Sequence, residues 1–140
     1  MDPKVRDALY RAVEKEPFAR RLDMQLVELE DGFSVIEMTY NPNEMNNIYD
    51  RAHGGAIFGL IDEAFETACQ THGTIAVALN VNVTYIASPE PGRRLPATAK
   101  EIGKTKRTAN YETKVTETDG RLIGICQALA FRTGKPIPFL

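Results

Sequence analysis

Apolar residues recur at helical spacing in two stretches of the chain, residues 4–16 and about 54–72. In the first, Val5, Leu9 and Val13 mark one face of a short amphipathic helix that Pro17 interrupts. In the second, apolar residues cover most of the circumference, which predicts a long helix buried nearly all round. Gly73 is a plausible C-cap for this helix.

The period changes to two after Gly73, which predicts four consecutive strands. Their expected ranges are about 77–85, 93–103, 107–118 and 121–133. The last strand carries apolar residues on both faces and is expected to be central. Pro96 indicates an edge or a bulge in the second strand.

Turn residues divide the rest of the chain. Asp31-Gly32 separates two weakly alternating segments, 24–30 and 33–40, and predicts a hairpin. Residues 41–52 are rich in turn formers and are expected to form a loop. Pro136 and Pro138 predict a frayed tail.

This order of elements predicts one α+β domain spanning residues 1–140, with a helical N-terminal segment at 1–22. A curved antiparallel sheet of five to six strands would wrap around one long central helix. A single helix can hardly cover so many strands, so we expect a second copy of the chain to cover the remainder.

Composition excludes several classes of function. The net charge is −2, so nothing draws the whole chain toward nucleic acid, and no apolar run is long enough to span a membrane. The charged N-terminus has no secretion signal, and a cytoplasmic location is the expectation. Cys69 and Cys126 form no CxxC unit and only two histidines exist, so we expect buried inert thiols and no metal.

Asp62 is the first candidate for chemistry because it stands in the middle of the apolar helix. Apolar surroundings raise the pKa of a carboxyl group and strengthen the carboxylate as a base. The alternative is a solvated Asp62, or one paired with Arg51 or Lys104. Glu63 and Glu66 are weaker candidates, expected on a solvated or subunit-facing stripe.

His53-Gly54-Gly55 opens the same helix. The unshielded N–H groups of the glycines could polarise a carbonyl group, although a tight turn explains them equally well. His53 and Asp62 stand nine residues apart, or ~13 Å along a helix, so one small group cannot touch both. If both take part, two chains must share each site.

A basic cluster is expected at Lys104, Lys106 and Arg107, together with Arg93 and Arg94. Such side chains suit the phosphates of a small ligand, but a solvated hairpin is the alternative. The cluster is too small for nucleic acid. Aromatic side chains provide candidates for an apolar acyl pocket: Phe58, Phe65 and Tyr49.

Several residues in order resemble the hotdog-fold acyl-CoA thioesterases of the phenylacetic-acid-degradation type. They are Asn47, His53-Gly54-Gly55, Asp62 and the stretch Asn82-Val-Thr-Tyr-Ile-Ala-Ser-Pro89. The resemblance extends from about residue 47 to 131 and implies a hotdog fold.

The resemblance also implies a site. Asp62 would act as general base or nucleophile, a Gly54 or Gly55 amide of the facing subunit would polarise the thioester, and Asn47 would orient the water or the carboxylate. His53 would hold the loop or touch the thioester. The substrate would be an aryl- or medium-chain acyl-CoA, and coenzyme A, as part of the substrate, would be bound near Lys104, Lys106 and Arg107. No separate cofactor is expected, and the chains would form homodimers that pair into homotetramers.

The chain departs from the family pattern at three positions. Asp50 replaces a glycine of the loop, and Glu63 follows Asp62 where relatives often have threonine or alanine. On the next strand, where some relatives place a serine, this chain offers Ala78 or Asn80, and Asn80 is the candidate for a substitute polar partner. The sequence therefore does not identify the acyl group of the substrate. Two alternative functions also stay open: a non-catalytic acyl-CoA sensor and a hotdog-type enoyl-CoA hydratase or dehydratase.

Overall fold

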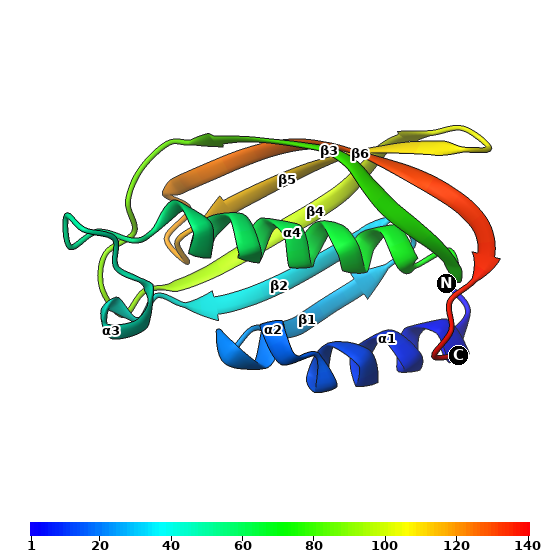
Figure 1. Cartoon of the computed structure of the whole chain (residues 1–140), viewed down its shortest axis with the longest axis horizontal. Helices are drawn as coiled ribbons and strands as arrows, with labels where there is room; N and C mark the ends of the chain where they lie inside the picture. Colours follow the sequence, from blue (N-terminus) through cyan, green and yellow to red (C-terminus); the bar gives the residue numbers. More distant parts are fainter.

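The computed structural model describes all residues from 1 to 140. A six-stranded antiparallel sheet curves around one long helix (Figure 1). The helices are α1 (Pro3–Lys15), α2 (Pro17–Arg21), α3 (Pro42–Met45) and α4 (Gly54–Gln70). The strands are β1 (Gln25–Glu30), β2 (Phe33–Thr39), β3 (Thr74–Tyr85), β4 (Arg94–Lys104), β5 (Thr108–Thr116) and β6 (Leu122–Pro136). The predicted α+β hotdog architecture is confirmed.

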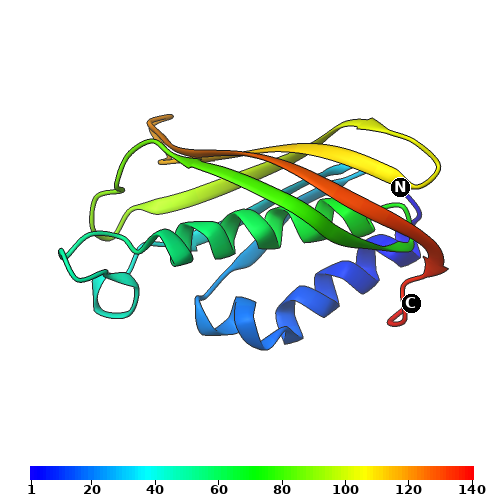
Figure 2. The same cartoon turned by 45° about the horizontal axis from the view of Figure 1, so that its top comes forward.

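The strand order β1-β2-β4-β5-β6-β3 leaves β1 and β3 at the two edges and places β6 inside the sheet, as predicted. Both views show α4 lying across the sheet, with α1 beside it near β1 (Figures 1 and 2). No helix combines the length and the apolar character that crossing a membrane requires.

The core forms where α4 packs on the sheet. Leu60, Ile61 and Ala64 are fully buried there, and the Phe65 ring meets the Tyr111 ring edge-on at 5.3 Å between centroids. Two polar bonds fix the β1–β2 hairpin to the helix. The Ser34 hydroxyl donates to the Ala64 carbonyl (2.6 Å), and the Gly32 N–H donates to the Thr71 hydroxyl oxygen (2.8 Å).

The α1–α2 segment also reaches α4, through Phe18. A Cβ atom on Gly59 would lie 2.7 Å from Cζ of Phe18, closer than such atoms can approach. Glycine at this position therefore lets α2 pack directly on α4.

The prediction for Pro96 was wrong. Its strand, β4, lies between β2 and β5, and its bulge lies at Glu101–Gly103. Pro96 pairs with Glu37 of β2, while the ladder with β5 begins only at Ala97. Proline is thus accommodated at the end of a ladder in an interior strand.

The prediction of a frayed tail at Pro136 and Pro138 was also wrong. β6 continues to Pro136, and Ile137 is only 3% exposed in a cluster with Val5, Leu9 and Leu29. Its N–H donates to the Gly73 carbonyl (3.2 Å). The predicted loop at 41–52 contains the short helix α3.

Candidate functional site

Most of α4 is buried, but one line along it is not. Gly55, Phe58, Asp62, Glu66 and Gln70 are exposed or half-buried and are spaced three or four residues apart. Residues at this spacing share one side of a helix. The prediction of a helix buried nearly all round is therefore modified: this line, with Asp62 at its centre, stays open in the single chain.

Asp62 borders a cavity of about 220 Å³ between α4 and β3. The cavity is lined by Asp62, Phe65, Glu66, Cys69, Ala76, Val77 and Ala78. Burial raises the pKa of Asp62 above its ordinary value, and no ion pair involves its carboxylate. The expected apolar surroundings are confirmed.

The alternative pairing of Asp62 with Arg51 or Lys104 was wrong. The Arg51 guanidinium donates to the Asp50 carbonyl, and Lys104 pairs with Glu101 at 3.4 Å. Asp62 is therefore a carboxylate without a charged partner at the edge of an accessible cavity, which suits a base or nucleophile.

Glu66 and Glu63 have different positions. Glu66 is exposed and shares the cavity of Asp62, and burial, Glu16 and Asp62 raise its pKa. Glu63 is only 3% exposed, so its expected place on a solvated or subunit-facing stripe was wrong. Burial, followed by the charges of Glu16 and Glu66, raises the pKa of Glu63 to about 8.

The glycine turn presents one open amide. His53 is the N-cap of α4, and its Nδ1 accepts a hydrogen bond from the Gly55 N–H (2.8 Å). Gly54 is the first residue of α4, where an N–H has no acceptor within the helix, and no other bond engages it. Its carbonyl accepts from the Tyr85 hydroxyl (3.1 Å). Of the two predicted amides, Gly54 alone is free to bind an oxygen.

Asn47 organises the loop before the turn. Its Oδ1 accepts from the Tyr49 N–H (2.9 Å) and the Arg51 N–H (3.2 Å). Asp50 has φ +55°, a left-handed conformation in which glycine is favoured and aspartate is tolerated. This accounts for the departure at Asp50: the loop keeps the conformation for which a glycine is suited.

Gly54 and Asp62 stand eight residues apart on one helix, or ~12 Å. The observed helix therefore upholds the distance argument made from the sequence. One thioester group cannot reach both within a single chain.

The predicted basic cluster is divided between two ends of the molecule. Arg94 begins β4 and pairs with Glu37, whereas Lys104 ends the same strand, ~30 Å away. The prediction that Arg93 and Arg94 join Lys104 was thus wrong. Lys106 and Arg107 are exposed in the β4–β5 turn and form no ion pair. The turn lies near the end of α4, opposite its glycine start (Figures 1 and 2).

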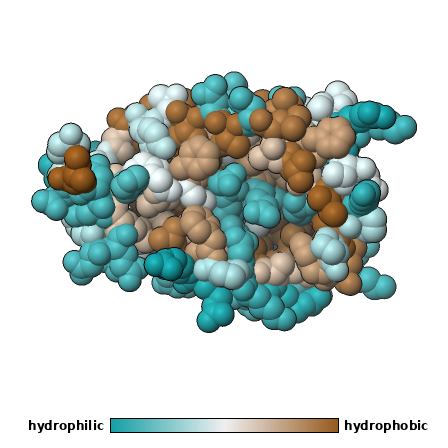
Figure 3. All heavy atoms as spheres, in the orientation of Figure 1, coloured by the Kyte–Doolittle hydropathy of each residue, from teal (hydrophilic) through white to brown (hydrophobic).

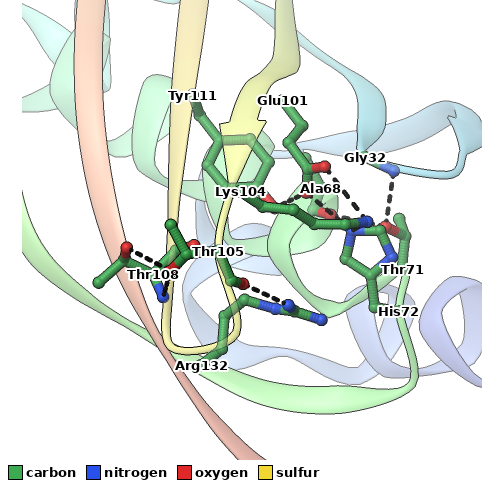
Figure 4. A network of polar contacts seen from close by, with 10 residues as sticks. All are labelled: Gly32, Ala68, Thr71, His72, Glu101, Lys104, Thr105, Thr108, Tyr111 and Arg132. Carbon is green, nitrogen blue, oxygen red and sulfur yellow. Dashed lines mark hydrogen bonds and ion pairs between the residues drawn. The ribbon is translucent and has the colours of Figure 1, made fainter.

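Lys104 belongs to a closed network (Figure 4). His72 Nε2 lies 2.7 Å from Glu101 Oε2, which also accepts from the Tyr111 hydroxyl (3.0 Å). Burial alone would raise the pKa of Glu101, but the hydrogen bonds to His72 and Tyr111 and the charges of His72 and Lys104 lower it. The sequence offered no signal for this network, because its members come from α4's end, β4 and β5.

The other predicted contact residues are separated. Phe65 lines the Asp62 cavity and Phe58 is half-buried on the open line, but Tyr49 is exposed on the loop. Asn80 lies on β3 and lines a different cavity of about 240 Å³ with Asn82, Asn110 and Gln127.

Both cysteines, Cys69 and Cys126, are buried, and burial raises the pKa values of their thiols, as inert thiols require.

Residues 49–123, more than half of the chain, match the family model described as the thioesterase superfamily. The chain belongs to the thioesterase superfamily. This superfamily member is 27% identical to the acyl-coenzyme A thioesterase PaaI of Escherichia coli over 124 residues, 89% of this chain and 88% of that protein.

Solved structures agree with this assignment. The E. coli PaaI protein of the phenylacetic acid degradation operon matches with a TM-score of 0.90 at 27% identity over 96% of both chains. A mutant of the phenylacetic acid degradation protein PaaI of Thermus thermophilus matches with a TM-score of 0.78 at 31% identity, over 84% of this chain and 99% of that one. The resemblance stated from the sequence is confirmed, and the predicted enzyme class, thioester hydrolase, agrees with this superfamily.

Proposed function

We propose that this thioesterase-superfamily protein hydrolyses acyl-CoA to a free acid and coenzyme A, with Asp62 as general base or nucleophile. The observation that carries the proposal is the position of Asp62, half-buried and without a charged partner on the open line of α4. The name of the E. coli relative, an acyl-coenzyme A thioesterase, supports the choice of substrate class.

The chemistry follows from a carboxylate with a raised pKa. As a base, Asp62 takes a proton from water while the water oxygen adds to the thioester carbonyl carbon. The carbon–sulfur bond then breaks, and the coenzyme A thiolate leaves and is protonated. As a nucleophile, the carboxylate adds to the carbonyl carbon, the carbon–sulfur bond breaks and the thiolate leaves, and water then hydrolyses the mixed anhydride to the free acid and the Asp62 carboxylate.

The developing negative charge on the carbonyl oxygen requires a donor. The open Gly54 N–H at the start of α4 is suited to this role, since a helix N-terminus favours negative charge. Because Gly54 and Asp62 of one chain are too far apart, we assign the amide to a second chain. His53 caps the turn and Asn47 closes the loop, so both position Gly54.

The edge strand β3 is suited to meet that second chain. Val77 and Leu79 are 47% and 59% exposed, and Tyr85 and Ile86 are also exposed. Hydrophobic residues gather on the face of the molecule along which β3 runs (Figure 3). An exposed apolar edge strand is open to pairing with another strand, and this supports a homodimer, with pairing into a tetramer as a further proposal.

Substrate contacts follow from the same arrangement. The cavity beside Asp62 offers Phe65 and Val77 as apolar walls for an aryl or medium-chain acyl group. Lys106 and Arg107 are available for the phosphates of coenzyme A, and the paired Lys104 is a weaker candidate.

A panel of acyl-CoA substrates with a thiol-detecting reagent tests the proposal. We expect release of coenzyme A by the wild type and a large loss in Asp62→Asn, while Asp62→Asn still binds acyl-CoA. Glu66→Gln is the matched control, since Glu66 lines the same cavity. Binding without hydrolysis by the wild type would indicate a sensor instead, and a larger loss in Glu66→Gln than in Asp62→Asn would move the base to Glu66.

Incubation with an enoyl-CoA examines the hydratase alternative. Hydration needs a histidine and an acid placed at carbon, but His72 is bonded to Glu101 and His53 caps α4. We therefore expect no hydration of the double bond. Formation of a hydroxyacyl-CoA would contradict the proposal.

A further inference from the structure

A second cavity, of about 290 Å³, lies between α1, α4, the start of β3 and the C-terminal tail. Three carboxylates from two distant parts of the chain converge on it: Glu16, Glu63 and Glu66. One oxygen from each lies within 4.8 Å of the other two. Glu66, Ala76 and Val77 also line the Asp62 cavity, so the two cavities adjoin.

The charge of these three groups is not balanced by the protein. No ion pair of the structure involves any of them. The remaining walls are mainly apolar, among them Leu9, Val13 and Ile137. Converging carboxylates repel one another, and the buried Glu63 is in addition costly to desolvate unless something neutralises it.

Glu63 provides an independent indication of a missing partner. Its side chain is 97% buried (3% exposed), it lines this cavity, and its Oε1 has no hydrogen-bond partner. Buried polar atoms without partners are rare in folded proteins. A proton shared between Glu16 and Glu63 is the competing way to neutralise this group, and the measurements below distinguish it from a bound cation.

Glu16 also turns toward the cavity instead of capping its own helix. It is the residue between α1 and α2 and the N-cap of α2, but its side chain makes no capping bond. Its carboxylate is therefore available to a ligand between the N-terminal helices and α4.

We propose that Glu16, Glu63 and Glu66 bind a hard divalent cation, of the class of Ca²⁺, Mg²⁺ or Mn²⁺. Oxygens that coordinate one Ca²⁺ at about 2.3–2.6 Å lie at most ~5 Å apart, which matches the observed convergence. Water molecules in the cavity complete the coordination. The cation ties the α1–α2 junction to α4 directly beside the Asp62 cavity.

Isothermal titration of the full-length, EDTA-treated protein in its native assembly tests the site, with CaCl₂, MgCl₂ and MnCl₂ as separate titrants. We expect saturable binding of at least one of them, at one ion per chain. Glu16→Gln and Glu63→Gln should each weaken binding at least about tenfold, because each removes one charged ligand. Glu14→Gln is the matched control, since Glu14 is an exposed glutamate near the end of α1, and this variant should bind the cation as the wild type does.

Thermal unfolding gives a second measurement. At about a hundred times the wild-type dissociation constant, the cation should raise the Tm of the wild type by roughly 5–10 °C and that of Glu16→Gln by about half as much or less. Glu16→Gln keeps this test available even if Glu63→Gln does not fold. No saturable binding by the wild type, or equal binding by the wild type and Glu16→Gln, would overturn the proposal and leave a shared proton as the neutralising group.

Discussion

Asp62 and Glu101 are both partly shielded carboxylates near α4, yet their environments are opposite. Asp62 has no charged partner, and burial raises its pKa. Glu101 contacts His72, Lys104 and Tyr111, and its pKa is lowered although burial opposes this. The first lines a cavity, while the second lies inside a network that leaves its oxygens occupied (Figure 4).

This difference shows how the fold assigns two roles to one type of side chain. An ionised carboxylate that lacks partners is a stronger base and costs stability, as functional groups often do. A carboxylate with several donors is held in place and stabilises the fold. The catalytic proposal for Asp62 and the structural role of Glu101 can therefore be separated by mutation.

The largest expected effect is on activity in Asp62→Asn. We expect kcat/KM for the best acyl-CoA substrate to fall by about 100- to 10,000-fold, because the amide cannot accept the proton of water. The free energy of unfolding should stay the same or rise by up to about 1 kcal/mol, since a half-buried charge is removed. Steady-state kinetics and urea denaturation measure the two quantities, and an unchanged kcat/KM would remove Asp62 from the mechanism.

Glu101→Gln should show the reverse pattern. We expect the free energy of unfolding to fall by about 1–3 kcal/mol, because His72 and Tyr111 lose a charged acceptor. The kcat/KM should stay within about threefold of the wild type. Glu112→Gln is the control, since its ion pair with Lys114 (3.0 Å) is exposed and contributes little. A larger loss of activity than of stability in Glu101→Gln would break the comparison.

Acid pH should affect the two carboxylates in sequence. The raised pKa of Asp62 predicts that kcat/KM falls about tenfold per pH unit once the pH drops below that pKa. The lowered pKa of Glu101 means that its stabilising contribution is present above its unfolded pKa and is lost only as the pH falls through its lower folded pKa. As the pH falls, catalytic activity should therefore be lost first, and the contribution of Glu101 to the free energy of unfolding should be lost only at a lower pH. Kinetics and denaturation across one pH series check the order, and coincident losses would contradict it.

The smallest effect is expected at the basic turn, where Lys104 is paired while Lys106 and Arg107 are free of ion pairs. The double variant Lys106→Ala/Arg107→Ala should raise KM by about three- to tenfold, with the increase shrinking at high salt. Lys104→Ala should change KM less, because Glu101 already holds its ammonium group. An unchanged KM in the double variant would place the coenzyme A phosphates elsewhere.

The local elements were largely predictable from the chain. The alternation after Gly73 predicted all four strands, and the dense apolar pattern predicted α4 within two residues. The predicted hairpin turn at Asp31-Gly32 joins β1 and β2, and Gly32 has φ +65°, a left-handed conformation that favours glycine. Asp62 stood out because a charged residue interrupts an apolar helix, which is visible without any tertiary contact.

The partners of each side chain were not predictable. Glu63 follows Asp62 directly, yet it faces Glu16, 47 positions earlier in the chain, while Asp62 faces β3. Arg94 and Lys104 belong to the same strand, yet they lie at its two opposite ends. Pro96 indicated an edge, but the order of the strands made β4 interior.

The sequence alone thus determined which segments become helix or strand, where the chain turns, and which carboxylate interrupts the longest apolar helix, because periods of 3.6 and two are local properties of the backbone. Tertiary structure decided that Glu101 is paired with His72 and Lys104, and that three glutamates converge without a counter-charge. Those outcomes depend on which distant element covers each face, and spacing along one segment carries no information about that.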